Sequence, residues 1–245
     1  MTQSTNSEYE DIFNYPDLNA FEPSQAIGIL GFIFETSREM GNVVNLKKGL
    51  DFAEKQNLDT FSDHDKMIFY YNIANGWSYL QRLTQVLNSL QFWEYESPEL
   101  DQQVINLRLA LKNSKNVNDD FNKSQILTNL GNLFSHLGRF SEALIYWQEA
   151  LKTTPDFPMA IGNIGFGLAH YAKVLYDKGH QLVFSHFAYK YLNQSIKLDM
   201  YKEAKQSFKK QILDLEAHID KKLLLLIPDL KNFKLGKSKG EISYR

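Results

Sequence analysis

Histidine is the residue type in this chain best suited to acid–base or metal chemistry, and the sequence contains six. His180 and His186 flank Gln181–Ser185 close to Asp177, which is the densest grouping of such side chains. No HExxH spacing occurs, so a surface imidazole in a loop and a half-buried one on a helix explain this pair more simply than a metal site. We therefore expect no metal site here.

Other catalytic signatures are also missing. The sequence has no Walker motif, no GxSxG motif and no dinucleotide fingerprint, and its glycine-rich stretch Gly162–Gly167 lies within a predicted helix. It has no cysteine, which excludes disulfides, thiolate metal sites and a cysteine nucleophile. We expect no catalytic residue and no cofactor, and therefore a protein that acts by recognition rather than as an enzyme.

The elements that would carry recognition are clearest in Ser124–Phe157, which predicts two short amphipathic helices joined at Gly138. Small and aromatic residues recur at fixed places in this stretch: Gly131, Phe134, Gly138, Phe140, Ala143, Trp147, Ala150 and Pro155. Gly within a helix costs ~1 kcal/mol relative to Ala. We interpret the small residues as the places where neighbouring helices approach closely.

This pattern resembles the tetratricopeptide repeat, a 34-residue helix-turn-helix unit that buries its apolar face by stacking on neighbours. Asn163-Ile164-Gly165 recurs 34 residues after Asn129-Leu130-Gly131, and Asn72-Ile73-Ala74 is a third copy. The resemblance implies an all-α fold, an α-α superhelix. We expect a solenoid of about four degenerate helical hairpins followed by a capping helix over about residues 201–226.

Two of the predicted hairpins depart from the 34-residue period. Tyr176–His180 is interpreted as an insertion, with the second helix resuming near Leu182, and the helix around Asn72 is expected to continue to about Phe92. The predicted organisation is a flexible acidic segment at 1–23, a helical repeat domain at 24–227 and a basic tail or linker at 228–245.

In proteins with this repeat, the first helix of each pair lines the concave face. The resemblance therefore implies a groove for a protein or an extended peptide, lined by Tyr71, Asn72, Asn75, Tyr79, Thr128, Asn129, Asn132, His136, Asn163, Phe166 and His170. An asparagine amide both donates and accepts hydrogen bonds, so a row of them suits a peptide backbone. The alternative use of each asparagine is to cap a turn or to bond a neighbouring helix.

One specific function of the family is disfavoured. Chaperone-binding repeat proteins grip a terminal carboxylate with two Asn and three Lys or Arg residues. Asn75 and Asn129 match the Asn places, but Tyr71, Met159 and Asn163 stand where the cations are expected. Without those cations the carboxylate would lose its charge-assisted hydrogen bonds.

Charge is unevenly distributed along the chain. Residues 1–65 hold 12 acids and 4 Lys or Arg, whereas residues 202–245 hold 11 Lys or Arg and 6 acids. The basic tail is compatible with nucleic acid, although no nucleic-acid motif accompanies it, and we prefer a solvated helix face and tail.

No signal peptide precedes the fold, and the longest apolar run, Leu223–Ile227, is too short to span a membrane. These features predict a cytoplasmic protein without membrane contact, whose oligomeric state they leave open.

A second, weaker resemblance concerns the last third of the chain. Tyr171–His180 and the ending Gly240–Arg245 resemble bacterial proteins in which such a repeat region precedes a HEPN domain, a helical ribonuclease-like module. A HEPN nuclease needs an Arg followed after four to six residues by His, and no Arg here meets that condition. This alternative implies a sensing or regulatory region of an RNA-targeting defence or toxin effector, with the catalytic part beyond Arg245.

Overall fold

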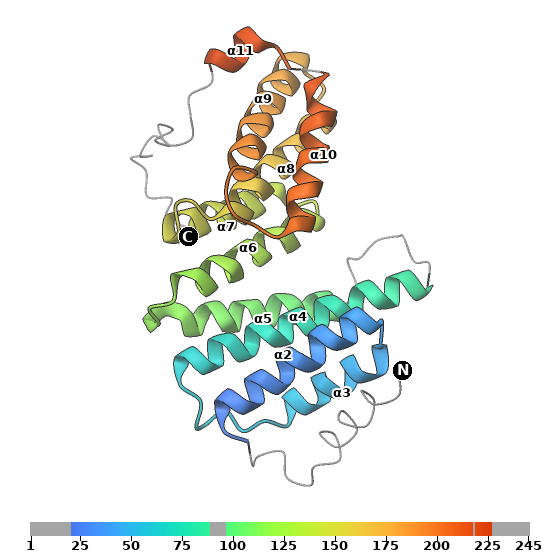
Figure 1. The fold of residues 1–245 in the computed structure, drawn as a ribbon, viewed down its shortest axis with the longest axis vertical. Coiled ribbons are helices and arrows are strands. Elements are labelled where there is room, and N and C mark those ends of the chain that lie inside the picture. Colours follow the sequence, from blue (N-terminus) through green and yellow to red (C-terminus); the bar gives the residue numbers. More distant parts are fainter. Residues whose placement is uncertain (1–20, 89–96, 218, 227–245) are drawn as a thin grey trace, which may run out of the picture. The chain divides into compact units, whose positions relative to one another are not determined.

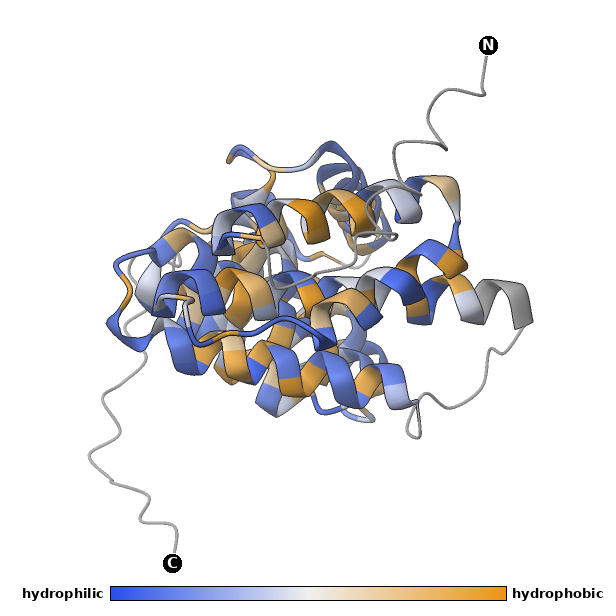
Figure 2. Cartoon of the chain, turned by 90° about the horizontal axis from the view of Figure 1, so that it is seen from below, coloured by the Kyte–Doolittle hydropathy of each residue, from blue (hydrophilic) through white to orange (hydrophobic). Residues whose placement is uncertain are grey.

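The computed structural model describes residues 21–88, 97–217 and 219–226, and every regular element within these ranges is a helix. The expected all-α, repeat-like fold is confirmed. Apolar and polar bands alternate along the helices (Figure 2), as expected for helices buried on one side. The chain divides into two compact units, Met1–Gly138 and Arg139–Arg245, and each is described by itself. The single repeat domain over residues 24–227 stays a prediction.

Unit 1 is a run of consecutive helices (Figure 1): α2 (Pro23–Met40), α3 (Val43–Glu54), α4 (Asp63–Asn88), α5 (Pro98–Asn113), the short 3₁₀ turn η3 (Ser114–Asn116) and α6 (Asp120–His136). α2 packs against α3 and α4, α4 against α5, and α5 against α6. Gly41 ends α2 with φ 65°, a left-handed conformation that favours glycine. Gly41 therefore ends α2 and leads the chain into α3.

Close approach of the first three helices depends on one aromatic ring. Phe34 of α2 is buried, and a Cβ added to Gly49 of α3 or to Gly76 of α4 would lie 2.9 Å or 2.7 Å from it. Two glycines on two helices thus make room for a single phenylalanine. The repeat pattern indicates Ala74 as the small residue of α4, and Ala74 is indeed buried, but Gly76 is the residue that contacts Phe34.

The boundary between α4 and α5 follows the sequence in part. Pro98 occupies the first turn of α5, where proline is favoured, and the Ser97 side chain does not cap the helix. Its hydroxyl donates instead to Glu99 Oε2 at 2.7 Å. α4 extends to Asn88, and its expected continuation to Phe92 lies outside the described residues.

Unit 2 contains α7 (Phe140–Thr153), α8 (Pro158–Val174), α9 (Lys178–Ser195), α10 (Lys202–Glu216) and α11 (Lys221–Leu226). α8 packs against α7, α9 and α10. A Cβ on Gly165 would lie 2.9 Å from the main-chain nitrogen of Leu192, so Gly165 lets α8 contact α9 at the backbone. The steric reason inferred for this repeated glycine is confirmed.

The predicted insertion at Tyr176–His180 is wrong. α8 continues to Val174, only Leu175–Asp177 form the turn, and α9 begins at Lys178 rather than near Leu182. Asp177 caps α9 because its Oδ1 accepts a hydrogen bond from the main-chain N–H of His180 at 2.7 Å. The additional residues therefore extend the hairpin and do not interrupt it.

The predicted single helix over about residues 201–226 is also wrong, since it is broken between Glu216 and Lys221. Its first part, α10, buries Phe208, Ile212 and Leu215. The expected polar face is confirmed, because Gln206, Lys209, Lys210 and Glu216 are exposed. α10 therefore has the two-sided character of a capping helix.

Candidate functional site

The candidate recognition surface of unit 1 involves the first helices of the predicted pairs, α2, α4 and α6. On α4, Asn72, Asn75 and Tyr79 follow one another at spacings of three and four residues and therefore share one side of the helix. All three are half-buried. We call Tyr71, Asn72, Asn75 and Tyr79 together the α4 face.

Asn72 is committed to helix packing. Its Nδ2 donates to the main-chain carbonyl of Ile27 on α2 at 3.3 Å. A Cβ on Gly31 would lie 3.6 Å from that nitrogen, so the small residue on α2 leaves room for the amide. The alternative use of asparagine, a bond to a neighbouring helix, is the one observed here.

Asn129 makes a similar contact between α6 and α4. Its Nδ2 lies 3.3 Å from the hydroxyl oxygen of Tyr71, to which it donates a hydrogen bond. Both side chains are half-buried. This pair links two first helices directly and fixes the positions of both side chains on the face.

The remaining predicted residues of unit 1 differ in exposure. Thr128 is only 3% exposed, so it is withdrawn into the interior and its predicted place on the surface is wrong. Asn132 is half-buried and His136 is exposed. Asn75 is half-buried and has no hydrogen bond within the described part of the chain, which leaves its amide open to a ligand.

A cluster on α2 was missed by the sequence analysis. The Tyr79 hydroxyl donates to Glu35 Oε1 at 2.5 Å, and Arg38 Nε donates to Glu35 Oε2 at 2.9 Å. The Arg38 guanidinium also lies over the Tyr79 ring, 5.4 Å from its centroid. Burial and the bond to Glu35 raise the pKa of Tyr79. Had the first-helix rule been applied to α2 as well, Glu35 and Arg38 would have been found.

The predicted residues on α8 belong to unit 2. The rings of Phe166 and His170 lie 4.6 Å apart between centroids, and Phe208 of α10 lies 6.5 Å from Phe166. A Cβ on Gly162 would lie 2.1 Å from Phe208, so α10 covers this part of α8. His170 is exposed, and partial burial together with the charge of Lys173 lowers its pKa. Asn163 is half-buried.

His64 and His180 each lie beside an aspartate that caps a helix. His64 Nε2 lies 3.2 Å from Asp119 Oδ2, and Asp119 caps α6 by accepting from the main-chain N–H of Asn122. His180 pairs with Asp177 at the start of α9. Within the described residues, no group of three or more His, Asp or Glu side chains is arranged to hold a metal ion.

The basic tail that is compatible with nucleic acid comprises residues 228–245, and these lie outside the described residues. No helix among those described is both long and apolar enough to cross a bilayer. The described first helices present asparagine, tyrosine and histidine side chains that are half-buried or exposed.

Comparison with known families supports this description. The sequence model of the tetratricopeptide repeat matches residues 124–157, which comprise most of α6, the turn at Gly138, α7 and the connection to α8. A search of curated proteins gave no match. Repeats of this kind generally bind protein partners and are generally non-catalytic.

Proposed function

We propose that this chain, which carries a tetratricopeptide repeat at residues 124–157, is a non-catalytic scaffold that binds an extended peptide or a protein partner through its first helices. In unit 1 the binding residues are those of the α4 face with Asn129, Asn132 and His136 of α6. The residues Asn163, Phe166 and His170 of α8 are predicted binding residues of unit 2 in their own right.

The observation that supports this proposal is the hydrogen bonding of the α4 face. Asn72 is fixed by α2 and Tyr71 by Asn129 of α6, while Asn75, three residues after Asn72 on the same helix, has no partner within the described residues. A half-exposed amide on a helix whose neighbours are locked loses little freedom when a ligand binds. It can accept and donate one hydrogen bond each to a peptide backbone.

The ligand chemistry follows from the charges on the face. Beside the face, Arg38 of α2 is already paired with Glu35 and with Glu39, and the Tyr79 hydroxyl donates to Glu35. We therefore expect recognition of peptide backbone and neutral side chains rather than of a terminal carboxylate. Tyr79, partly covered by Arg38, supplies apolar surface beside the amides.

The test begins with peptides of about 12 residues, selected from a random display library against the purified chain. Binding of one selected peptide is then measured by calorimetry with the Asn75→Ala/Asn132→Ala variant. Because each lost hydrogen bond contributes about 0.5–1.5 kcal/mol, we expect binding to weaken about tenfold. Amidation of the peptide's C-terminus should leave the affinity unchanged.

A matched control is Asn118→Ala, since Asn118 is an exposed asparagine of unit 1 outside the first-helix faces. This variant should bind like the unaltered protein. Equal binding by the Asn75→Ala/Asn132→Ala variant would place the recognition surface elsewhere and refute the proposal.

A further inference from the structure

The turn between α8 and α9 carries an unusual group of exposed apolar side chains. Tyr171 and Val174 lie in the last turn of α8, and Tyr176 lies in the connection Leu175–Asp177 that follows it. Tyr176 is fully exposed, Val174 is 72% exposed and Tyr171 is at the edge of exposure. Burying a valine or an aromatic side chain is favourable, so leaving both in water forgoes that stabilisation.

These side chains stand on a fixed frame. The Tyr171 ring is stacked on Phe140, with 5.1 Å between centroids, and contacts Phe184 edge-on at 5.4 Å. In the turn, the Gln181 side chain donates to the carbonyl of Leu175, and the main-chain N–H of Gln181 donates to the carbonyl of Asp177 at 2.9 Å. A surface already ordered in this way loses little conformational entropy on binding.

The charge around the turn is positive. Lys173 and Lys178 are exposed, and neither has an acidic partner within the described residues, since Lys178 Nζ bonds the neutral Gln181. The single carboxylate of the turn, Asp177, is occupied by the N–H of His180 and by its imidazole. Two unpaired cations therefore flank the exposed valine and tyrosine.

We propose that this hairpin tip, made of Tyr171, Lys173, Val174, Tyr176 and Lys178, binds an acidic segment of a partner protein. Apolar side chains of that segment would cover Val174 and Tyr176, and its carboxylates would pair with Lys173 and Lys178. The mixture of exposed apolar side chains and cations favours such a segment over a purely polar ligand. The site is separate from the α4 face and does not depend on peptide binding there.

The test uses a short fluorescein-labelled peptide that alternates Asp or Glu with Leu or Phe, and measures its binding to the full chain by anisotropy. Val174→Ser/Tyr176→Ser and Lys173→Glu/Lys178→Glu should each weaken binding at least about tenfold. Because the four side chains are exposed, these variants should unfold at the same temperature as the unaltered protein.

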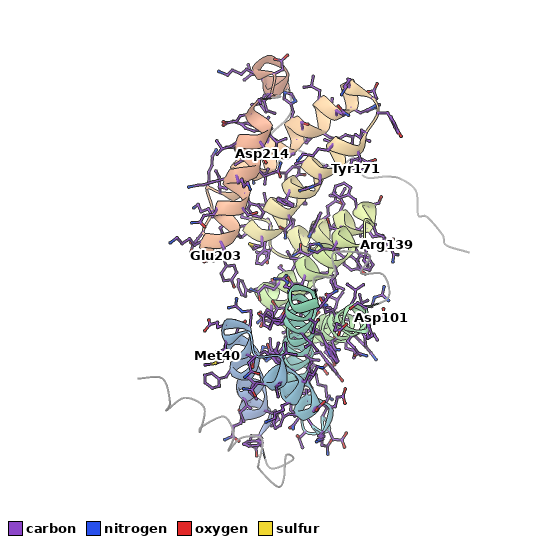
Figure 3. The ribbon with its side chains drawn as sticks, turned by 90° about the vertical axis from the view of Figure 1, so that its right-hand side faces the viewer. Met40, Asp101, Arg139, Tyr171, Glu203 and Asp214 are labelled. Carbon is purple, nitrogen blue, oxygen red and sulfur yellow. The ribbon has the colours of Figure 1, made fainter. Side chains whose placement is uncertain are left out.

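Matched controls come from α10, which carries exposed Leu213, Lys209 and Lys210. Figure 3 shows Tyr171 on the side of unit 2 away from α10, where Glu203 and Asp214 are labelled. Leu213→Ser and Lys209→Glu/Lys210→Glu should change the affinity less than about twofold, since surface changes away from a site have small effects.

Several outcomes would overturn the proposal. The first three are absence of binding, unchanged binding by the tip variants, and equal losses of affinity in the α10 controls. The proposal would also fail if a peptide with Lys in place of its acidic residues, or with Ser in place of its apolar residues, bound equally well. Loss of binding on Asn75→Ala instead would assign the peptide to the α4 face. If the tip bound phosphatidylserine vesicles in place of the peptide, the occupant would be a lipid surface. If the tip mediated self-association in place of peptide binding, the occupant would be a second copy of this chain.

Discussion

The imidazole of His186 on α9 accepts a hydrogen bond from the main-chain N–H of Asp220, at 2.8 Å and 34 positions later in the chain. The other ring nitrogen, Nδ1, lies 2.6 Å from the carbonyl of Leu182 and donates to it. The same Nε2 also lies 2.9 Å from the main-chain carbonyl of Asp220, so the ring contacts both main-chain polar groups of that residue. His186 is fully buried, and it holds the turn at which the predicted C-terminal helix is broken into α10 and α11.

Replacing His186 by Leu should therefore destabilise unit 2. The change removes both hydrogen bonds of a buried ring, and we expect a loss of about 1–3 kcal/mol in the free energy of unfolding. Urea denaturation followed by circular dichroism measures it. As a control, His180→Gln alters an exposed imidazole of the same helix, paired only with exposed Asp177, and should change stability by less than about 0.5 kcal/mol. A stable His186→Leu variant would show that the bonds to Asp220 and Leu182 are dispensable.

Gly165→Ala should destabilise the α8–α9 hairpin. Its Cβ would meet the main-chain nitrogen of Leu192 at 2.9 Å, and a main-chain atom cannot rotate away. We expect a cost of about 1–3 kcal/mol from overpacking, which exceeds the gain of about 1 kcal/mol in helix propensity.

Gly28→Ala is the matched control for that change. Gly28 is an exposed glycine within α2, and an added Cβ has no neighbour within 4 Å. Only the propensity gain applies, so this variant should be more stable by up to about 1 kcal/mol. Thermal melts that rank the two variants in the opposite order would contradict the packing described for Gly165.

Stability should fall at alkaline pH partly through Tyr79. Burial and the bond to Glu35 raise the pKa of this phenol in the folded protein. A group with a raised folded pKa stabilises the fold below its unfolded pKa, about 10 for tyrosine, and the stabilisation is lost as pH rises beyond that value. In urea titrations at pH 8 and pH 11, Tyr79→Phe should lose less stability over this interval than the unaltered protein. Equal losses would mean that other groups, such as half-buried Tyr191, account for the pH dependence.

Substitutions of Asn72 and Asn75 should affect the free energy of unfolding differently, because only Asn72 bonds a neighbouring helix within the described residues. Asn72→Ala removes the bond to the Ile27 carbonyl and should lower the free energy of unfolding by about 1 kcal/mol. Asn75→Ala removes no bond within the described residues, so its stability should stay within about 0.5 kcal/mol of the unaltered protein. Chemical denaturation of both variants checks this, and a larger loss from Asn75→Ala would mean that its amide has a structural partner.

The fold was largely predictable because its signals are local. The 34-residue recurrence of Asn129-Leu130-Gly131 in Asn163-Ile164-Gly165, with Gly41 and Gly138 ending helices at φ 65° and 73°, marks helices and turns from short spacings. The break between α10 and α11 was not predictable in this way. It depends on His186, far away in the sequence, and apolar periodicity continues through Ile219 regardless of that contact.

The candidate face was harder to predict because periodicity indicates a side of a helix but not the partner of a side chain. Asn72 and Asn75 look alike in the sequence, yet Asn72 reaches a carbonyl on α2 and Asn75 reaches none within the described residues. Thr128 lies beside Asn129 in the chain, but the side chain of Thr128 is turned inward. Only the packing of the neighbouring helix distinguishes these cases.

The position of the boundary between the two compact units has a practical meaning for dissecting this protein. It falls between Gly138 and Arg139, inside the segment matched by the repeat family. A fragment cut at the limits of the repeat would take α6 from one unit and α7 from the other, and would leave Trp147 without α8 and Leu127 and Leu130 without α5. Expression trials should instead cut the chain at the Gly138–Arg139 junction, even though that divides the one segment whose family is known.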